Sequence, residues 1–374
     1  MKITAKDSVV NLKPYVNGSH SEEILKNHKK ILKLDSNEST VPPSPRVLMA
    51  LSHHIQEGPL NWYPDVESSM LRRKLADYVN LPSENIMTFN GSDHALKIIT
   101  RVFLNPGDEA IIFHPTYDHF RVYVETSDAK IVPVREALNV SFKDKVLKGL
   151  SDKTKIVYLV NPNNPTGFLT PQTEIEEAVS SYKNILFIVD EAYFEFCGES
   201  SAQLVKKYHN IVVTRSFSKA FGMASLRCGY LLACEDICHE IGKVRIGKNI
   251  NALAQVAAFH ALDDLEYMYH FVEEVKTAKA WISQYMREMG LVVRDTPANY
   301  LLVKVAQPKK VLDCLKEENI LIRDRSQLSD LEGFVRLTVG DQFTMKRFWR
   351  VFSKIPKEFL VGSVDGAQNE EKMY

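Results

Sequence analysis

The feature that most constrains the fold is a regular alternation of strand-like and helix-like segments from about residue 86 to residue 233. The strand-like segments, such as 156–160 and 185–189, are short, apolar and rich in β-branched residues. Polar turns separate them from segments with apolar residues at helical spacing. This alternation is typical of an α/β protein with a doubly wound, mostly parallel sheet. Functional residues are expected beyond the carboxyl ends of its strands, where such sheets bind ligands.

The charge balance restricts the kinds of partner. The chain carries 47 lysine and arginine residues and 47 aspartate and glutamate residues, so its formal net charge is zero. This argues against nucleic acid or a membrane surface bound through bulk charge. The polar N-terminus lacks the apolar core of a signal peptide, and no apolar run approaches the roughly 20 residues that span a bilayer. We therefore expect a cytoplasmic protein without a membrane partner.

The cysteines indicate a reducing environment. There are five, an odd number, and none belongs to a CxxC motif. Cys234 and Cys238 could share one face of a helix. Because no histidine is expected beside them, we predict no metal site.

Five polar segments follow predicted strands, and the segment around Lys219 is the most informative. It carries Ser216, Ser218 and Arg227 between two strand-like runs. A lysine amine can form a Schiff base with an aldehyde cofactor, and hydroxyls with a guanidinium can hold that cofactor's phosphate. We therefore predict pyridoxal 5'-phosphate; a solvated loop of charged residues is the alternative for this segment alone. The other four segments are 90–93, 115–117, 161–167 and 190–193.

Two further segments suit the phosphate and the ring nitrogen of this cofactor. Ser92 and Asp93 follow a glycine turn at the start of a predicted helix, and a helix N-terminus favours an anion. The ring nitrogen must stay protonated, which requires a facing carboxylate. Asp190, at the end of a predicted buried strand, is the candidate. Its alternative role is that of a helix cap.

The remaining candidates complete the site. Tyr193 and Asn164 can donate hydrogen bonds to the ring's phenolate oxygen, and Tyr117 can cover the ring face. Lys219, once released by substrate, can act as the general base. Arg336, on a predicted strand of the C-terminal region, can pair bidentately with a substrate carboxylate; the alternative is a surface arginine on an edge strand.

Several motifs occur together and in a fixed order over nearly the whole chain. They are NLKPY (11–15), NWYPD (61–65), GSDH (91–94), PTY (115–117), NPNNPTG (161–167), VDEAY (189–193), SFSKAFGMASLRCGY (216–230), LIRDR (321–325) and VRLTVG (335–340). With these motifs the chain resembles the fold-type I pyridoxal-phosphate aminotransferases. It is most similar to the histidinol-phosphate aminotransferase family.

The resemblance implies a homodimer and assigns the substrate side. Tyr63 would reach the cofactor phosphate of the partner subunit. Tyr15 and Arg323 would bind a substrate phosphate, whereas Arg336 and Asn164 would bind an amino-acid carboxylate. The implied substrate-binding residues, with Asn37 included, are Tyr15, Asn37, Asn164, Arg323 and Arg336.

The implied reaction moves an amino group between glutamate or 2-oxoglutarate and a small phosphorylated substrate, with histidinol phosphate and imidazole-acetol phosphate as the first candidates. The chain departs from the family at Asn37–Pro42, at His94, at 118–120 and in the basic segment 243–248. For that segment we expect a solvated face, and substrate binding is the alternative. Three alternatives therefore remain: an aminotransferase for another phosphorylated or anionic substrate, a phospho-amino-acid decarboxylase, or a cofactor-free binding protein.

The length of 374 residues allows two domains. A long helix predicted over 264–289 precedes one further helix and several short strands, among them one over 320–323, a pattern typical of a smaller α+β domain. We expect an N-terminal arm with part of the small domain over 1–34, a large domain for pyridoxal phosphate over 35–263, the small C-terminal domain over 264–361 and a flexible tail over 362–374.

Overall fold

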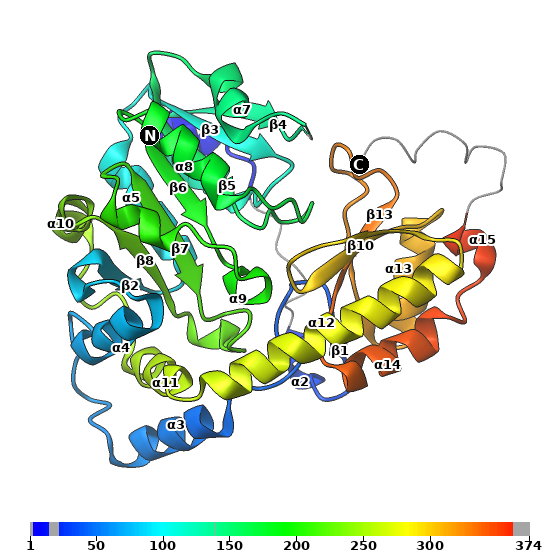
Figure 1. The fold of residues 1–374 in the computed structure, drawn as a ribbon. Coiled ribbons are helices and arrows are strands. Elements are labelled where there is room, and N and C mark those ends of the chain that lie inside the picture. Colours follow the sequence, from blue (N-terminus) through cyan, green and yellow to red (C-terminus); the bar gives the residue numbers. More distant parts are fainter. Residues whose placement is uncertain (1–2, 15–21, 138, 362–374) are drawn as a thin grey trace. The chain divides into compact units, whose positions relative to one another are not determined.

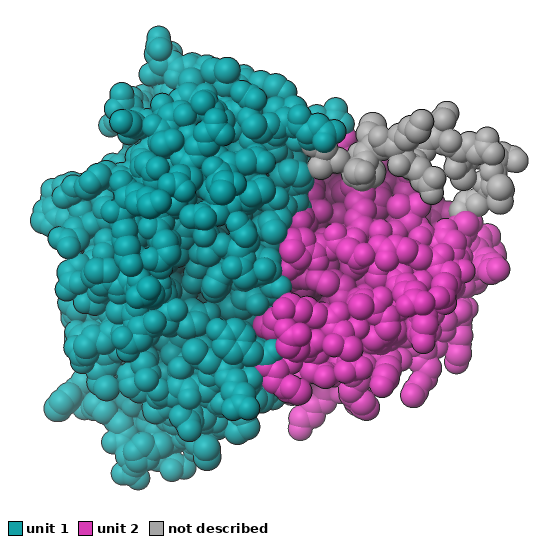
Figure 2. Space-filling model, in the orientation of Figure 1, with its two compact units in different colours: residues 1–15, 42–164, 168–269 teal, residues 16–41, 165–167, 270–374 magenta. Residues whose placement is uncertain are grey.

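The computed structural model describes residues 3–14, 22–137 and 139–361. The chain divides into two compact units, shown in different colours in Figure 2. Unit 1 comprises residues 1–15, 42–164 and 168–269, and unit 2 comprises residues 16–41, 165–167 and 270–374. Within the described residues, no helix has the length and apolar character needed to cross a membrane.

Unit 1 is built on a seven-stranded sheet with the order β2-β8-β7-β6-β5-β3-β4 (Figure 1). The strands from β7 to β4 are parallel to one another, and β8 is antiparallel to both of its neighbours. The predicted doubly wound, mostly parallel sheet is therefore confirmed. The strands are β2 (Ile86–Phe89), β3 (Glu109–His114), β4 (Lys130–Arg135), β5 (Thr154–Val160), β6 (Leu186–Asp190), β7 (Ile211–Ser216) and β8 (Gly229–Ala233).

Helices cover both faces of this sheet, which explains why its central strands are apolar throughout (Figure 1). On one face, alternate residues Ile156, Tyr158 and Val160 of β5 join a core with α5, α6 and α10. On the other face, Phe142 of α7 packs against Phe187 of β6. The helices of unit 1 are α1 (Asp7–Val10), α3 (Pro45–Glu57), α4 (Ser69–Val79), α5 (Ser92–Phe103), α6 (His119–Thr126), α7 (Phe142–Gly149), α8 (Gln172–Ser181), α9 (Phe194–Cys197), α10 (Glu235–Val244) and α11 (Ala252–Leu262).

Unit 2 contains a four-stranded antiparallel sheet with the order β12-β13-β10-β9, and a separate pair in which β1 runs parallel to β11. Its strands are β1 (Leu32–Lys33), β9 (Val292–Asp295), β10 (Tyr300–Lys304), β11 (Ile320–Leu321), β12 (Arg323–Asp324) and β13 (Phe334–Thr338). Its helices are α2 (Glu22–Lys26), α13 (Pro308–Glu317), α14 (Gln342–Phe352) and α15 (Lys357–Leu360), and α12 (Leu265–Glu288) contributes all but its first turn.

Two of the elements expected from the sequence can be compared with the structure. The long helix expected over 264–289 is confirmed by α12. The single strand expected over 320–323 is wrong, because β11 pairs with β1 whereas β12 pairs with β13. The buried Ile322 separates the two short strands.

Candidate functional site

An anion cradle forms where α5 begins. Gly91 precedes the helix with φ +79°, and no side chain among the described residues caps the first turn. The backbone N–H of His94 donates to the Gly91 carbonyl at 3.2 Å, so the N–H groups of Ser92 and Asp93 are the ones available to an anion. The guanidinium of Arg227 lies beside them, with Nη2 3.2 Å from Asp93 Oδ2 and Nη1 3.4 Å from Ser218 Oγ. Ser216 Oγ accepts a hydrogen bond from the Ser218 backbone at 3.1 Å.

Two glycines permit this close approach. A Cβ atom at Gly91 would lie 2.5 Å from Arg227 Nη2, and one at Gly229 would lie 2.5 Å from the Ser92 backbone nitrogen. Only the absence of side chains brings the guanidinium and the helix N-terminus so near each other. The cradle therefore fits the phosphate of pyridoxal phosphate, which needs backbone N–H groups, hydroxyls and a guanidinium.

A buried carboxyl group ends β6. Asp190 is 4% exposed, and it accepts hydrogen bonds of 3.0 Å from the hydroxyls of Tyr158 and Thr214. Thr214 lies opposite Asp190 in the register of β6 and β7. Burial raises the pKa of Asp190 to about 6, because desolvation disfavours the charged form. A carboxylate held in this way is suited to face a protonated ring nitrogen.

Lys219 lies in the tight turn that follows β7. The turn is fixed by backbone hydrogen bonds from Phe217 to the Cys228 carbonyl and from Gly222 to the Lys219 carbonyl. The Lys219 ammonium lies 5.9 Å from the ring centroid of Tyr193, which is buried three residues beyond Asp190. The structure therefore brings the three predicted catalytic groups to the same edge of the sheet.

The loop containing Tyr117 is tied to this edge at two points. The Tyr117 hydroxyl donates to Asp93 Oδ1 at 2.9 Å. The Thr116 hydroxyl donates to Asn163 Oδ1 at 2.5 Å, and Asn163 Nδ2 donates to the Pro115 carbonyl at 2.9 Å. These contacts join the loop to the cradle and to the segment 161–167, which contains Asn164.

The residues that support the site through buried hydrogen bonds and an ion pair were not predicted from the sequence. Tyr158 and Thr214 were not identified as partners of Asp190. Arg215 was not identified either, and it forms a buried ion pair of 2.9 Å with Glu191 and lies 3.6 Å from the Phe194 ring centroid. A charged residue at the end of an apolar strand was the available signal, because buried charges are usually paired.

Unit 2 holds a second group of predicted site residues. Arg336 lies on the central strand β13, is 3% exposed and donates to the Asp35 carbonyl at 2.7 Å. The alternative of a surface arginine on an edge strand is therefore wrong. Arg323 lies directly opposite it on β12. The buried Asn37 donates its backbone N–H to Thr338 Oγ1 at 2.9 Å, two positions beyond Arg336.

The expectation of a solvated face for the basic segment 243–248 is wrong at Arg245, whereas Lys248 is exposed. The Arg245 side chain is only 7% exposed and pairs with Glu67 at 3.0 Å. The Lys248 ammonium lies 3.6 Å from the ring centroid of Tyr63. Tyr63 itself is 76% exposed. Tyr15 and the predicted tail lie outside the described residues.

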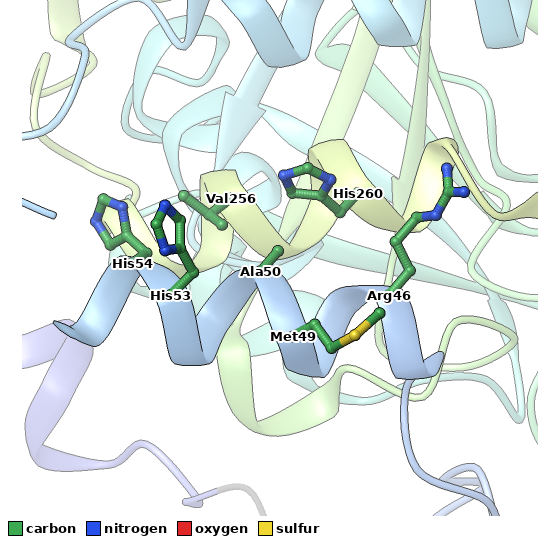
Figure 3. Close-up of a pocket in the computed structure, with 7 residues that line it drawn as sticks. All are labelled: Arg46, Met49, Ala50, His53, His54, Val256 and His260. Carbon is green, nitrogen blue, oxygen red and sulfur yellow. The ribbon is translucent and has the colours of Figure 1, made fainter. Parts of the chain in front are cut away.

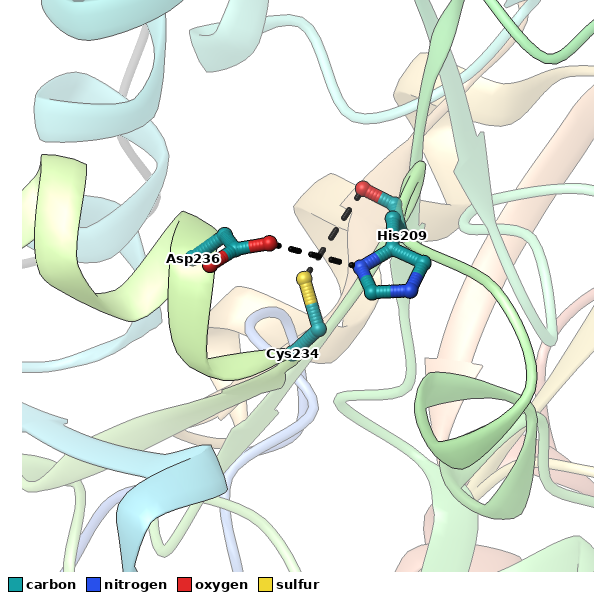
Figure 4. Close-up of side chains that lie close together, drawn as sticks. All are labelled: His209, Cys234 and Asp236. Carbon is teal, nitrogen blue, oxygen red and sulfur yellow. Dashed lines mark hydrogen bonds and ion pairs between the residues drawn. The ribbon is translucent and has the colours of Figure 1, made fainter.

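A mixed cluster of metal-ligand types lies elsewhere in unit 1. One potential ligand atom from each of His209, Cys234 and Asp236 lies within 4.8 Å of the others, and the histidine and aspartate form a pair at 3.5 Å (Figure 4). The expectation that no histidine would accompany Cys234 was therefore wrong. The side chains of His209 and Asp236 are largely exposed.

A pocket of about 450 Å³ lies between α3 and α11 and contains none of the predicted site residues (Figure 3). Its histidines project from both helices. The lining residues are Arg46, Met49, Ala50, His53, His54, Val256 and His260.

Comparisons with known proteins agree with this geometry. Residues 29–352 match the family described as aminotransferase class I and II, so the chain belongs to the class I and II aminotransferases. The predicted class of enzyme, an aminotransferase that uses pyridoxal phosphate, is thereby confirmed.

Three relatives show how similar the chain is to known members. It is 34% identical to the dihydroxyacetone phosphate transaminase of Campylobacter jejuni, over 91% of this chain and 94% of that protein. It is also 34% identical to histidinol-phosphate aminotransferase 2 of Carboxydothermus hydrogenoformans, over 92% and 96%. The histidinol-phosphate aminotransferase of Sinorhizobium meliloti, solved with pyridoxal-5'-phosphate, has the same fold, with a TM-score of 0.84, 23% identity and coverage of 94% and 97%.

Proposed function

We propose that this aminotransferase exchanges an amino group between glutamate and a small phosphorylated ketone, with histidinol phosphate and imidazole-acetol phosphate as the first candidate pair. The observation that carries the proposal is the shared position of Lys219, Asp190 and the Arg227 cradle at one edge of the sheet. Pyridoxal phosphate, when bound, supplies an electron sink for the carbon that loses a proton.

The residues of unit 1 have distinct roles in this proposal. Lys219 holds the cofactor aldehyde through its amine and, once displaced by substrate, moves a proton at the substrate Cα. Asp190 keeps the ring nitrogen protonated, and Tyr193 and Asn164 donate hydrogen bonds to the ring oxygen. Tyr117 covers the ring face. The phosphate is held by Ser92, Asp93, Ser216, Ser218 and Arg227.

The residues of unit 2 serve the substrates. Arg323 and Arg336 occupy directly opposed positions, and a guanidinium binds carboxylate or phosphate groups through two parallel hydrogen bonds. Arg336 is assigned to the amino-acid carboxylate and Arg323 to the substrate phosphate. Asn37 completes this assignment within unit 2, and Tyr15 is assigned to the substrate phosphate by the family resemblance alone.

A homodimer is the proposed assembly. Large apolar side chains are exposed on α3, on the segment after it and on α4, all in unit 1. Exposed apolar side chains of this kind are typical of a protein interface, and the family resemblance supports a second copy at this surface. The exposed residues are Leu48, Met49, Ile55, Leu60, Trp62, Tyr63, Val66 and Met70.

A second candidate substrate is a phosphorylated ketone without an imidazole ring. The relative from Campylobacter jejuni, named for dihydroxyacetone phosphate, is as similar to this chain as the histidinol-phosphate relative is. The substrates in both names are phosphate monoesters with a short carbon chain. The proposal therefore requires a phosphate group in the substrate but does not require an imidazole ring.

The test is a substrate panel with the purified enzyme loaded with pyridoxal phosphate. Glutamate is expected to change the visible absorbance of the bound cofactor, and 2-oxoglutarate is expected to accumulate with imidazole-acetol phosphate or with dihydroxyacetone phosphate. Unphosphorylated analogues are the controls. Failure of every amino donor to alter the absorbance would contradict the proposal, and release of carbon dioxide without 2-oxoglutarate would indicate a decarboxylase.

A further inference from the structure

The side chain of Lys248 lies over the exposed ring of Tyr63. The Lys248 ammonium lies 3.6 Å from the Tyr63 ring centroid, and both side chains are exposed. A cation is attracted to the face of an aromatic ring by the ring quadrupole. The two side chains therefore present a phenol and a positive charge together on the surface of unit 1.

The chain segments that carry this pair are fastened to each other. Arg245 donates two hydrogen bonds of 3.0 Å to the carboxylate of Glu67. Gln255 Nε2 donates to the Asp65 carbonyl at 2.9 Å. Because these contacts lie on both sides of the lysine and just beyond the tyrosine, Lys248 and Tyr63 are held as one unit.

The lysine segment is also fastened to strand β2 and to the loop that carries Arg227. Asn249 Nδ2 donates to the Thr88 carbonyl at 3.0 Å, and Asn251 Nδ2 donates to the carbonyl of Leu226, the residue before Arg227. The position of the exposed pair therefore depends on the same framework that positions the cradle.

The charge of Lys248 is not neutralised within the part of the chain that the structure describes. Arg245 is paired with Glu67 and Lys243 with Glu240, whereas no carboxylate of the described residues pairs with Lys248. A phosphate monoester carries between about −1.5 and −2 charges at pH 7 and forms strong hydrogen bonds with an ammonium. An exposed, positioned ammonium of this kind is suited to such an anion.

We propose that Lys248 is a specificity-determining residue that acts in trans. In the homodimer it accompanies Tyr63 into the site of the partner subunit, where its ammonium binds the phosphate of the substrate. The inference rests on the proposed function and adds to it the residue, and the subunit supplying that residue, that recognise the phosphate monoester of the amino acceptor.

The first test compares Lys248→Met, which removes the charge, with Lys248→Arg, which keeps it. Lys248→Met is expected to raise the KM for the phosphorylated ketone about tenfold, as for the loss of one charge-assisted hydrogen bond, and to leave the KM for glutamate within about twofold. The dissociation constant of glycerol 3-phosphate, measured at equilibrium by the absorbance of the bound cofactor, is expected to rise equally. Lys248→Arg is expected to restore both values.

The matched control is Lys243→Met, which removes a charge from the same basic segment. Lys243 pairs with Glu240 at 2.6 Å, and this pair is exposed on α10. The control is expected to change neither the KM nor the glycerol 3-phosphate constant. Equal effects of Lys243→Met and Lys248→Met would overturn the proposal, since a general loss of surface charge would then explain both.

The second test establishes which subunit supplies the lysine. A heterodimer that pairs a Lys219→Ala subunit with a Lys248→Met subunit has one working site, which receives the intact Lys248 from the Lys219→Ala subunit. Action in trans predicts a wild-type KM in this heterodimer. It predicts a raised KM when both substitutions are on one chain and the partner is wild type. The reverse pattern would overturn the proposal.

The proposed function and the inference about Lys248 are refuted by different results. If no phosphorylated ketone accepts an amino group from glutamate, the proposed function fails. If the wild-type enzyme transfers the amino group but Lys248→Met leaves the KM and the glycerol 3-phosphate constant unchanged, only the inference about Lys248 fails.

Discussion

Arg323 lies directly opposite Arg336 across the antiparallel strands β12 and β13, so two like charges face each other on one side of the sheet of unit 2. Such an arrangement opposes sheet stability unless an anion or a fixed dipole compensates the charge. Arg336 donates to the Asp35 carbonyl at 2.7 Å, and its guanidinium lies 5.6 Å from the ring centroid of Tyr300. We interpret the opposed pair as a site kept for anionic substrates.

The two arginines are expected to separate the two substrates kinetically. Arg323→Met should raise the KM for the phosphorylated ketone by about 10- to 100-fold, because a guanidinium–phosphate contact is a strong charge-assisted one. It should leave the KM for glutamate nearly unchanged. Arg336→Met is the matched variant and should affect glutamate more. Steady-state kinetics with both substrates varied provides the measurement, and equal effects of Arg323→Met on both substrates would refute the phosphate role.

Replacement of Lys219 should abolish turnover without unfolding the protein. Lys219→Ala removes both the covalent attachment and the base, so kcat should fall by several orders of magnitude. The side chain is only partly buried in a turn held by backbone hydrogen bonds, so the melting temperature of the cofactor-free protein should change little. A variant that retained more than a few per cent of the wild-type kcat would show that another group moves the proton.

Asp190 should make the stability of the cofactor-free protein depend on pH. Its pKa is raised from 3.8 to about 6 in the folded state, so the folded protein binds more protons than the unfolded chain between these values. The free energy of unfolding should therefore fall as pH rises from about 4 to about 6, by up to about 3 kcal/mol from this group.

Urea unfolding of the wild type and of Asp190→Asn over that pH range measures this contribution. The asparagine cannot titrate, so the difference in unfolding free energy between the two proteins should change across pH 4 to 6 and level off above it. A constant difference would show that Asp190 ionises normally in the folded protein. With pyridoxal phosphate bound, the trend should weaken, because a protonated ring nitrogen compensates the carboxylate.

Gly91 offers a direct test of the phosphate cradle. Gly91→Ala would place a Cβ atom 2.5 Å from Arg227 Nη2 and should weaken pyridoxal phosphate binding by at least tenfold. Gly107→Ala is the matched control, because Gly107 also has a positive φ, +87°, but its Cβ would meet no atom within 4 Å. Both variants should lose about 1 kcal/mol of stability from backbone strain. A cofactor dissociation constant that rose equally in both variants would argue against the cradle.

The sequence predicted those parts of the site that depend on local order along the chain. Asp190 follows an apolar strand, and Lys219 follows the next one, so their common edge could be inferred from the rules for parallel sheets. The partners of Asp190 could not be inferred. Tyr158 and Thr214 lie on the two strands that flank β6, and their alignment with Asp190 depends on a register that the sequence does not display.

Long-range contacts account for the other differences. Lys248 and Tyr63 are far apart in sequence, and a basic segment by itself predicts a solvated face. Helix α14 was not predicted, although Asp341 caps it through a hydrogen bond from the Thr344 backbone at 3.0 Å and a cap residue is a readable signal. The strand expected over 320–323 divided because pairing partners, rather than local composition, decide where short strands end.

The most direct test of the account is to reduce the enzyme loaded with pyridoxal phosphate using borohydride and to map the modified peptide by mass spectrometry. The account predicts one cofactor per chain, attached to the Lys219 amine, and no attachment in Lys219→Ala. Attachment at another lysine, or a protein that remains colourless and unmodified with added pyridoxal phosphate, would contradict it.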